Sequence, residues 1–387
     1  MIKALIAVNA GSSTLKFCAY AMQDGALLMR GLIDHFGQPH TSLSLHDTLH
    51  QQLEERILGD DSREAAVAAM INTLADHGIA ASAVVHRVVH GGSRFHAVTR
   101  LDDEICQALE TYIPLAPLHQ PVSLQVIQAF QSVDAGLPQL ACFDTAFHSQ
   151  QPEVATRFGI ARHWHEEGVR RYGFHGLSYS SINRKLAGLE LADRKVVVCH
   201  LGSGASACAI QQGQSVASSM GFSAVDGLMM GTRPGYLDPE VVLYWLEHEG
   251  MGVSEVRREL YKNSGLLGVS GGLSADMRAL LEDKSGAARE AVELFCYRIV
   301  REIGSLAAAM KGLDAIIFTA GIGEHSAEVR GRVLAQLGWL GFELDHAANL
   351  AHAPRLTTAH SSHHAYVLST DEEGEMARQA FQLLQTS

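Results

Sequence analysis

The sequence predicts a layered α/β protein built from two similar halves, and three observations support this fold class. Short β-branched runs alternate along the chain with stretches of helical periodicity, which is typical of α/β layers. A strand that runs into a small glycine and serine turn occurs at the start of the chain and is echoed about half the chain later. The 387 residues also exceed what one hydrophobic core usually organises. We therefore expect two lobes that face each other across a cleft.

The expected elements follow from local pattern. Strands are predicted over residues 4–8, 83–90, 139–143, 195–200, 315–319 and 366–369. Helices are predicted over residues 63–77, 122–130, 238–249, 274–283, 287–311 and 326–337. Asp238, Ser274 and Ser326 are expected to cap helix N-termini, and Gly312 to end a helix in a left-handed conformation. The segment 34–61 gives no clear pattern.

The composition excludes several classes of protein. The formal net charge of −12 has the wrong sign for a chain that binds nucleic acid or anionic lipid by bulk charge. No stretch approaches the roughly 18 uncharged apolar residues that span a bilayer. Asn9 interrupts the first apolar run before it reaches signal-peptide length, so we expect a cytoplasmic protein. The six cysteines form no C-x-x-C pair and are expected to be reduced core thiols.

Three strands run into glycine-containing segments, at residues 9–13, 200–206 and 319–324. Glycine allows positive φ and close approach, so such turns can present backbone N–H groups to phosphate oxygens. Lys16 lies just beyond the first of them. The chain has neither a P-loop nor a G-x-G-x-x-G fingerprint after a strand. The turns predict a phosphate site of another type, and the alternative that they simply end strands stays open.

Four polar residues stand at strand ends or beside glycines in segments that otherwise look buried: Arg87, Asp144, His175 and Arg233. A buried arginine is costly unless it is paired or binds an anion. Two arginines, a carboxylate and a histidine would suit a phosphoryl-transfer site. Two alternatives stay open here, namely an internal ion pair between Arg87 and Asp144 and a hydrogen-bonded core histidine at position 175.

Six stretches of the chain resemble the acetate kinase family, which also contains propionate kinases: 9–17 (NAGSSTLKF), 86–92 (HRVVHGG), 143–148 (FDTAFH), 171–176 (RYGFHG), 227–233 (GLMMGTR) and 318–324 (FTAGIGE). The resemblance runs in order from residue 9 to about residue 376, which is essentially the whole chain. It implies the duplicated ribonuclease-H-like fold of the actin-like ATPases. It also implies reversible, direct transfer of the ATP γ-phosphoryl group to acetate, a homodimer, and Mg²⁺ with Mn²⁺ as a substitute.

The resemblance further implies which residues act. One lobe would comprise residues 1–148 plus 370–387. The second lobe would comprise residues 149–369 and would bind the nucleotide. Asp144, His175 and Arg233 would be catalytic. The carboxylate substrate would be bound by Arg87, Val89, Leu118, Phe174 and Ala224. The nucleotide would contact Ser12, Lys16, His200, Leu201, Gly202, Ser203, Gly204, Asp276, Met277, Arg278, Gly321, Ile322, Gly323, Glu324 and His325. Asn9 and Glu372 would position the metal, with Glu373 a near alternative to Glu372.

The chemistry of the acceptor limits what these residues need to do. A short carboxylic acid is ionised at pH 7, so the nucleophile needs no strong general base. Family descriptions give the residue that matches Asp144 a proton-transfer role. Physical chemistry instead favours a role for Asp144 in positioning the metal or orienting Arg87, because the nucleophile has no proton to lose.

Several positions depart from the family pattern. Ser203 stands where the family usually has asparagine, and Tyr179 stands where it has histidine. Tyr236 replaces a usual aspartate, and His325 replaces a usual asparagine. At Ala224 the family usually has proline, so the acceptor pocket is expected to be slightly roomier and to accept propionate. Two further alternatives stay open: propionate as the main substrate, and an ATP-driven switch of the same superfamily with no acyl acceptor.

Overall fold

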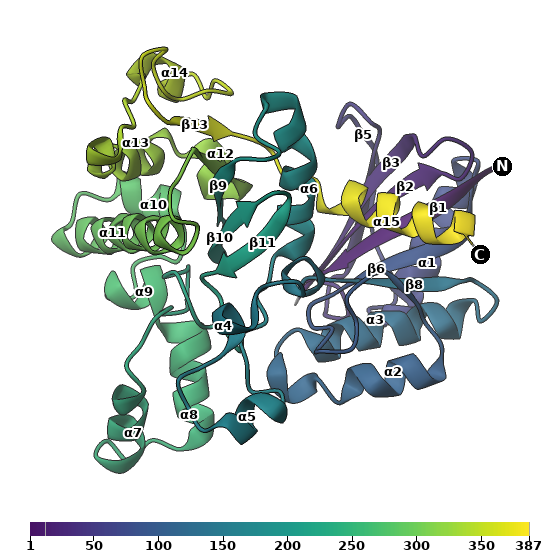
Figure 1. Cartoon of the computed structure of the whole chain (residues 1–387). Coiled ribbons are helices and arrows are strands. Elements are labelled where there is room, and N and C mark those ends of the chain that lie inside the picture. The colour runs from purple at the N-terminus through teal and green to yellow at the C-terminus, as the bar shows by residue number, and fades with distance from the viewer. Residues whose placement is uncertain (12, 387) are drawn as a thin grey trace. The chain divides into compact units, whose positions relative to one another are not determined.

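The computed structural model describes residues 1–11 and 13–386. The chain divides into two compact units (Figure 1). The first comprises Met1–Ala146 and Asp371–Ser387, and the second comprises Phe147–Thr370. Each unit has a sheet of its own with helices on both faces.

The sheet of the first unit has eight strands in the order β5-β4-β3-β2-β1-β6-β8-β7. Their bounds are β1 Ile2–Ala10, β2 Thr14–Ala21, β3 Leu27–Asp34, β4 Ser42–His46, β5 Gln52–Ile57, β6 Ile79–Val88, β7 Thr99–Arg100 and β8 Gln139–Phe143. Strand β1 pairs antiparallel with β2 and parallel with β6. Strand β6 pairs parallel with β8, so the C-terminal ends of β1, β6 and β8 lie at one edge of the sheet.

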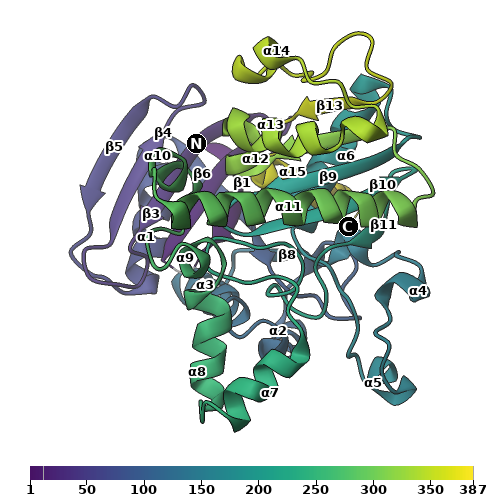
Figure 2. The same ribbon diagram turned by 90° about the vertical axis from the view of Figure 1, so that its left-hand side faces the viewer.

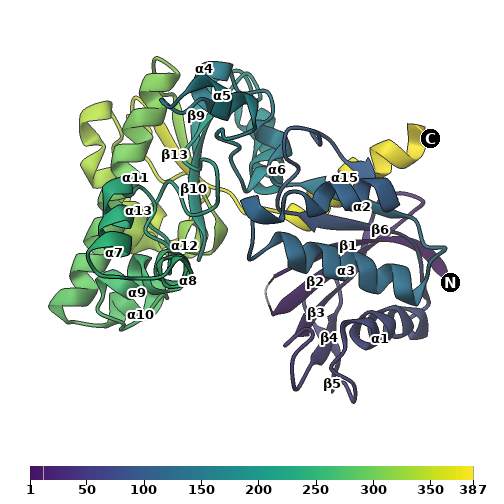
Figure 3. The ribbon, with the colours of Figure 1, turned by 90° about the horizontal axis from the view of Figure 1, so that it is seen from below.

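Helices cover both faces of this sheet, and their bounds are α1 Arg63–Asp76, α2 Asp103–Glu110, α3 Gln120–Val133 and α15 Glu372–Thr386. Alternate residues of β1 (Ala4, Ile6 and Val8) pack in one core cluster with residues of α1 and α3. Helix α15 packs on β1, β6 and β2 and lies on the opposite face (Figure 3). The central strands are therefore buried on both sides, which explains their continuous apolar sequence.

The sheet of the second unit has five strands in the order β11-β10-β9-β12-β13. Their bounds are β9 Lys195–Leu201, β10 Ala205–Gln211, β11 Gln214–Ser218, β12 Ala315–Thr319 and β13 His364–Val367. The helices are α4 Glu153–Thr156, α5 Arg162–Glu166, α6 Gly176–Leu186, α7 Pro239–Glu247, α8 Val253–Arg258, α9 Gly265–Val269, α10 Met277–Glu282, α11 Gly286–Ala309, α12 Ala320–His325, α13 Ala327–Gln336 and α14 His346–Leu350.

Helices α6 and α11 cover opposite faces of this second sheet (Figure 3). Helix α6 contributes Tyr179, Ile182 and Leu186 to a core cluster with alternate residues of β9, β10 and β12. The long helix α11 runs across the other face, with α9, α10 and α13 packed beside it (Figure 2).

The two units share one strand pattern, which confirms the predicted duplication. In the first unit the order β3-β2-β1-β6-β8 has two antiparallel pairs followed by two parallel pairs. In the second unit β11-β10-β9-β12-β13 has the same sequence of pairings. The described residues of the repeated sequences at 4–13 and 196–206 contain the equivalent strands β1 and β9. The third copy, at 315–324, is different because Ala320 already begins helix α12.

Most predicted elements are present, and the differences concern one helix cap, one helix end, one segment without a prediction and the bounds of one strand. Asp276, not Ser274, caps α10, since its side chain accepts from the backbone N–H of Ala279. Lys311 takes the left-handed conformation after α11, with φ of 57°, and Gly312 follows with φ of 142°. The segment without a clear pattern contains β4 and β5. The last predicted strand is shifted by two residues, to His364–Val367.

Two expectations from composition can be compared with the structure. Among the described residues, none of the helices is both long and apolar enough to cross a membrane. All six cysteines are free thiols. Cys142, Cys199, Cys208 and Cys296 are buried, whereas Cys18 and Cys106 are half-buried.

Candidate active site

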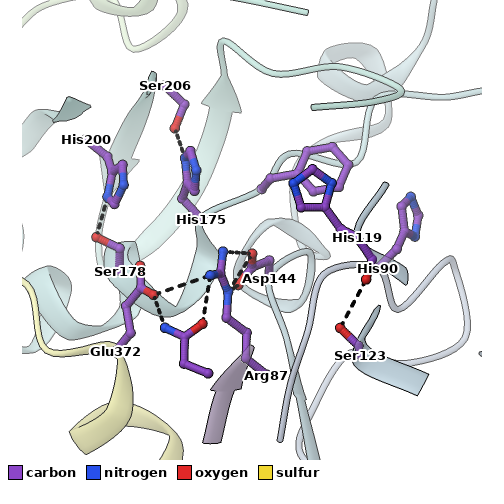
Figure 4. Close-up of polar contacts among 12 residues, drawn as sticks. Arg87, His90, His119, Ser123, Asp144, His175, Ser178, His200, Ser206 and Glu372 are labelled. Carbon is purple, nitrogen blue, oxygen red and sulfur yellow. Dashed lines mark hydrogen bonds and ion pairs between the residues drawn. The ribbon is translucent and has the colours of Figure 1, made fainter. Parts of the chain in front are cut away.

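Arg87 stands near the C-terminal end of β6 and is fixed by side chains from neighbouring elements (Figure 4). Its Nη2 lies 2.6 Å from Oδ2 of Asp144, and its Nε lies 3.1 Å from both carboxylate oxygens. Its Nη1 donates to Oδ1 of Asn9 at 3.0 Å. Asp144 directly follows β8, the parallel neighbour of β6, so the sheet itself brings the two residues together. The internal ion pair between Arg87 and Asp144, one of the alternatives left open by the sequence, is therefore present in the structure.

A second carboxylate group lies on the other side of this arginine. Oε2 of Glu372 is 3.8 Å from Nη1 of Arg87. The amide of Asn9 donates to Oε2 of Glu372 at 3.2 Å and to Oε1 of Glu373 at 3.0 Å. Burial raises the pKa of Glu372 above its ordinary value, and Asp144 and Glu373 add to this while Arg87 opposes it. A cation near Glu372 would relieve this excess of negative charge.

These oxygen donors fit a magnesium ion held in part by a substrate. Mg²⁺ prefers hard oxygen ligands and usually takes only one or two carboxylates, because water and phosphate oxygens fill the other positions. In the described part of the chain, no group of three His, Cys, Asp or Glu side chains forms a metal cage. Asn9, Glu372 and Glu373 could together supply oxygens to such a partly hydrated ion.

In the second unit, His175 stands at the start of α6 with a left-handed backbone, φ 57° and ψ 26°. Non-glycine residues rarely take this conformation, and it is found preferentially at functional sites. Its Nδ1 lies 2.8 Å from Oγ of Ser206 (Figure 4). Its ring stacks on that of His200, with centroids 4.2 Å apart. Oγ of Ser178 lies 2.8 Å from Nδ1 of His200.

Arg233 belongs to the same unit and points to the same turn as His175. A Cβ on Gly204 would lie 2.8 Å from Nη2 of Arg233 and 3.4 Å from Nε2 of His175. Glycine at this position therefore lets both side chains approach the β9–β10 turn. The guanidinium donates from Nη1 to the backbone oxygen of Ala224 at 2.7 Å.

In the part of the chain that the structure describes, no carboxylate balances the charge of Arg233. Among the described residues, none of the Asp or Glu side chains forms an ion pair with it. Burial lowers the pKa of its guanidinium, which nevertheless stays protonated at neutral pH. A partly buried cation without a counter-charge is a strong site for an anion. Tyr236, which replaces the expected aspartate, instead donates to the backbone oxygen of Ser219 at 3.3 Å.

The loop that carries Arg233 is closed by a glycine that the sequence analysis did not identify. Gly265 has φ of +65°, and a Cβ on it would lie 2.1 Å from the carbonyl oxygen of Met230. The backbone N–H of Leu266 donates to that same oxygen at 2.8 Å. The sequence gives only a weak signal for this glycine, because a glycine between a polar and an apolar segment is common in loops.

The residues predicted to surround adenosine lie on two helices of the second unit. Gly321, Ile322, Gly323, Glu324 and His325 form most of α12, directly after β12. The carboxylate of Glu324 folds back and accepts from the backbone N–H groups of Ala320 and Thr370. Asp276 is used as the cap of α10, Met277 is buried behind it, and Arg278 is exposed.

Arg330 supports helix α12 and was also missed. It is fully buried and donates to the carbonyl oxygens of Gly323 and Glu324 at 2.9 and 2.8 Å. Asn349 accepts from it through both its side-chain and its backbone oxygen. A signal was available, because Arg330 occupies a position on the apolar face of its helix beside Val333 and Leu334.

The remaining predicted residues fall in both units. Val89 is buried and Leu118 is partly exposed in the first unit, whereas Phe174 is buried and Ala224 half-buried in the second. Lys16 is exposed on β2, opposite Asn9 of β1. In the β9–β10 turn, Gly202 donates to the backbone oxygen of Gly204, and Ser203 accepts from the N–H of Gly231. Ser12 lies outside the described residues.

Comparison with known proteins gives a consistent result over the full chain. The model of the acetokinase family matches residues 4–378. An acetate kinase of Rhodopseudomonas palustris is 47% identical over 396 residues, which cover 99% of each protein. A crystal structure of Porphyromonas gingivalis acetate kinase aligns with a TM-score of 0.88 at 32% identity, covering 99% of this chain and 100% of that one. A propionate kinase from Francisella tularensis aligns with a TM-score of 0.91 at 31% identity, covering 98% and 99%.

Proposed function

The chain belongs to the acetokinase family, and from this membership we propose that it catalyses reversible transfer of the ATP γ-phosphoryl group to acetate. The fold is the two-lobed, actin-like ATPase fold of the acetate kinases. The observation that carries the proposal is the 47% identity to an acetate kinase over essentially the whole chain. The geometry supports it, because Arg233 is a partly buried cation beside His175 with no acidic partner among the described residues.

The reaction joins an anion to a polyanion, so neutralising charge is the main task of the protein. A carboxylate oxygen of acetate attacks the γ-phosphorus, the bond from phosphorus to the bridging oxygen of ADP breaks, and acetyl phosphate and ADP result. Arg87 would bind the acetate carboxylate, with Asp144 holding its guanidinium in a fixed orientation. Arg233 and His175 would donate to oxygens of the transferring phosphoryl group.

Asp144 is better suited to orientation than to proton transfer. Its side chain is almost fully buried and accepts three contacts from Arg87. An ionised acetate carries no proton that a base would need to remove. We therefore assign Asp144 the role of holding Arg87 and shaping the acidic group near the metal.

Mg²⁺, when bound with ATP, would supply additional neutralisation of charge. Asn9 and Glu372, with Glu373, would hold it through oxygen atoms or through water. Lys16, Ser12 and the turn from His200 to Gly204 would contact nucleotide phosphates, and the residues of α12 and the start of α10 would surround the adenosine. We propose the same two lobes as expected above, residues 1–148 plus 370–387 and residues 149–369, with ATP bound by the second lobe.

Propionate is the second candidate substrate. The propionate kinase of Francisella tularensis is similar over 98% of this chain, and alanine stands at position 224 where proline is usual in acetate kinases. Val89, Leu118, Phe174 and Ala224 would line the acceptor pocket. One methylene changes discrimination by only about 1–3 kcal/mol in an apolar pocket. A preference for acetate of a thousandfold in kcat/KM would exclude this second activity.

A direct test uses ATP, Mg²⁺ and a series of C2 to C4 carboxylic acids, with hydroxylamine to trap the acyl phosphate as a hydroxamate. We expect hydroxamate with acetate and with propionate, and ADP formation that depends on the added acid. Release of ADP at the same rate without any acid would favour an ATP-driven switch of the same superfamily. Replacement of Arg87 or Arg233 by alanine should remove most of the product while the far-ultraviolet circular dichroism stays unchanged.

A homodimer and a cytoplasmic location are proposed on the family resemblance. In the second unit, Trp339 and Leu350 are 77% and 72% exposed, which leaves apolar surface for a subunit contact. Light scattering on the purified chain would give twice the mass of 41.8 kDa if the dimer forms.

A further inference from the structure

Two buried residues behind His175 have no role in the site as proposed so far. Tyr179 lies on α6, and its Oη is 2.5 Å from Oγ of Ser206 on β10. The same Oγ is 2.8 Å from Nδ1 of His175. Figure 4 marks this contact between Ser206 and His175 with a dashed line. Tyr179 and Ser206 are both fully buried. The three side chains therefore form a hydrogen-bond chain from the core to the imidazole ring.

The first proton in this chain belongs to the phenol. Burial raises the pKa of Tyr179 well above its ordinary range, so the hydroxyl keeps its proton. In the described part of the chain, Oγ of Ser206 is the hydrogen-bond partner of Tyr179 Oη, and Tyr179 packs in a core cluster with Ile182 and Val198. The rings of His148 and His200 also lie beside it, but Nδ1 and Nε2 of His148 contact Ser215 and the carbonyl of Phe174, and Nδ1 of His200 contacts Ser178. Tyr179 therefore donates to Ser206.

The direction of the second bond follows from the first. Ser206 has one hydroxyl proton, and its Oγ already accepts from Tyr179. Its own proton is then directed to His175, so Nδ1 of His175 is an acceptor. In the reverse arrangement Nδ1 would donate to Ser206, and Ser206 would donate to Tyr179. The phenol proton would then be buried without an acceptor, which is unfavourable.

We propose that Tyr179 and Ser206 are positioning residues, which hold neutral His175 in the tautomer that carries its proton on Nε2. This nitrogen faces the position next to Gly204 that Nη2 of Arg233 also faces. The proton on Nε2 is then available for an oxygen of the transferring phosphoryl group at the place where Arg233 supplies its charge. The inference rests on the proposed phosphotransferase function, because the acceptor for Nε2–H of His175 is an oxygen of the transferring phosphoryl group.

The tautomer can be measured without turnover. Long-range ¹H–¹⁵N spectra of the chain labelled at histidine distinguish a proton on Nε2 from one on Nδ1, and the spectrum of His175→Gln identifies the signal of His175. At pH 8 we expect the Nε2–H form in the unmodified chain. Tyr179→Phe should give a mixture of both tautomers, because the hydroxyl of Ser206 can then turn away from the ring.

Kinetics provide the second measurement. Tyr179→Phe should lower kcat about fivefold to tenfold and leave KM for ATP unchanged, since one neutral hydrogen bond is lost and the nucleotide contacts remain. Ser206→Ala should have the same effect, and the double variant should be no slower than either single one, because both act through His175. Tyr366→Phe is the control, since it removes a hydroxyl beside the same core cluster and should change neither the tautomer nor kcat.

Two results would overturn the inference. One is a proton on Nδ1 of His175 in the unmodified chain at pH 8. The other is a Tyr179→Phe chain with the spectrum and kcat of Tyr366→Phe. If Tyr179→Phe fails to fold, the unmodified chain and Ser206→Ala still decide the question. An unmodified chain with the Nε2–H tautomer and no acyl phosphate product would instead contradict the proposed function alone.

Discussion

Arg87 and Asp144 form a close ion pair at the ends of two adjacent parallel strands, with Nη2 and Oδ2 2.6 Å apart. The carboxylate is almost fully buried, whereas a fifth of the arginine side chain remains accessible. The carboxylate of Asp144 is therefore fixed in the protein, and part of the Arg87 side chain remains available to a ligand. A carboxylate substrate that binds this arginine would meet a guanidinium whose orientation is already determined.

Asp144→Asn should lower kcat/KM for acetate by about a hundredfold, mostly by weakening acetate binding, because the amide cannot hold the guanidinium as a charged partner does. This corresponds to about 2.7 kcal/mol. Steady-state kinetics with varied acetate would measure it. Glu375→Gln is the matched control, since it neutralises a buried carboxylate paired with Arg378 in the same unit. Equal losses in both variants would mean that Asp144 has no special role toward Arg87.

Gly265→Ala should disrupt the loop that carries Arg233. The added methyl would lie 2.1 Å from the carbonyl oxygen of Met230 and 2.8 Å from the backbone nitrogen of Arg233, so the loop must shift. We expect kcat to fall more than about tenfold. Gly271→Ala has nearly the same φ, +70°, with open space around it, and should cost only the conformational strain of about 1 kcal/mol. Similar activities of the two variants would contradict this account.

Arg330→Met should weaken ATP binding and stability together. It removes the donors to the carbonyl oxygens of Gly323 and Glu324, and Nδ1 of His352 remains 3.0 Å from the second of these oxygens. Loss of a hydrogen bond to a buried carbonyl costs about 1–3 kcal/mol, so thermal unfolding should occur several degrees lower. KM for ATP should rise about tenfold if α12 contacts the nucleotide. Arg332→Met, on the exposed side of the same helix, is the control. An unchanged KM for ATP would remove α12 from the proposed nucleotide site.

Acid should destabilise the chain in part through His86. Its Nε2 lies 2.7 Å from Oε1 of Gln139, and its buried Nδ1 has no hydrogen-bond partner among the residues that the structure describes. Burial lowers the pKa of His86 from 6.5 to about 4, so protonation favours the unfolded chain. The stability is fully present above pH 6.5, falls progressively between pH 6.5 and pH 4, and the loss amounts to about 3 kcal/mol.

Urea unfolding of His86→Gln between pH 7.5 and pH 5 would measure this contribution. The variant should show a shallower loss of unfolding free energy with acid than the unmodified chain. His96→Gln, at an exposed position of the same unit, should keep the original slope. If the unfolding free energy falls equally steeply with acid in all three proteins, His86 does not titrate as its burial requires.

The sequence was a good guide where one residue type has one physical reason to be present. Strands 139–143 and 315–319 were predicted to the residue because continuous apolar runs mark strands buried on both faces. The contact between Arg87 and Asp144 was anticipated because a charge in a buried strand needs a partner. The repeated motif at 4–13 and 196–206 correctly indicated two equivalent sheets.

The sequence was a poor guide where tertiary contacts decide. Strands β4 and β5 carry many polar residues, and the pairing of β4 with β3 and of β5 with β4 is not visible in local pattern. Gly265 packs against Met230 and Arg233, and Arg330 bonds to Asn349 of α14, so local pattern does not reveal these contacts. Ser274 and Asp276 can both cap a helix, and only the three-dimensional structure distinguishes them.

The most direct test of phosphoryl transfer to a carboxylate is a ³¹P NMR time course of the chain with ATP, Mg²⁺ and acetate. We expect an acyl phosphate signal that grows in step with ADP, and its near disappearance in both Arg87→Ala and Arg233→Ala. Inorganic phosphate appearing with ADP while no acyl phosphate forms, or undiminished acyl phosphate in both variants, would contradict the account.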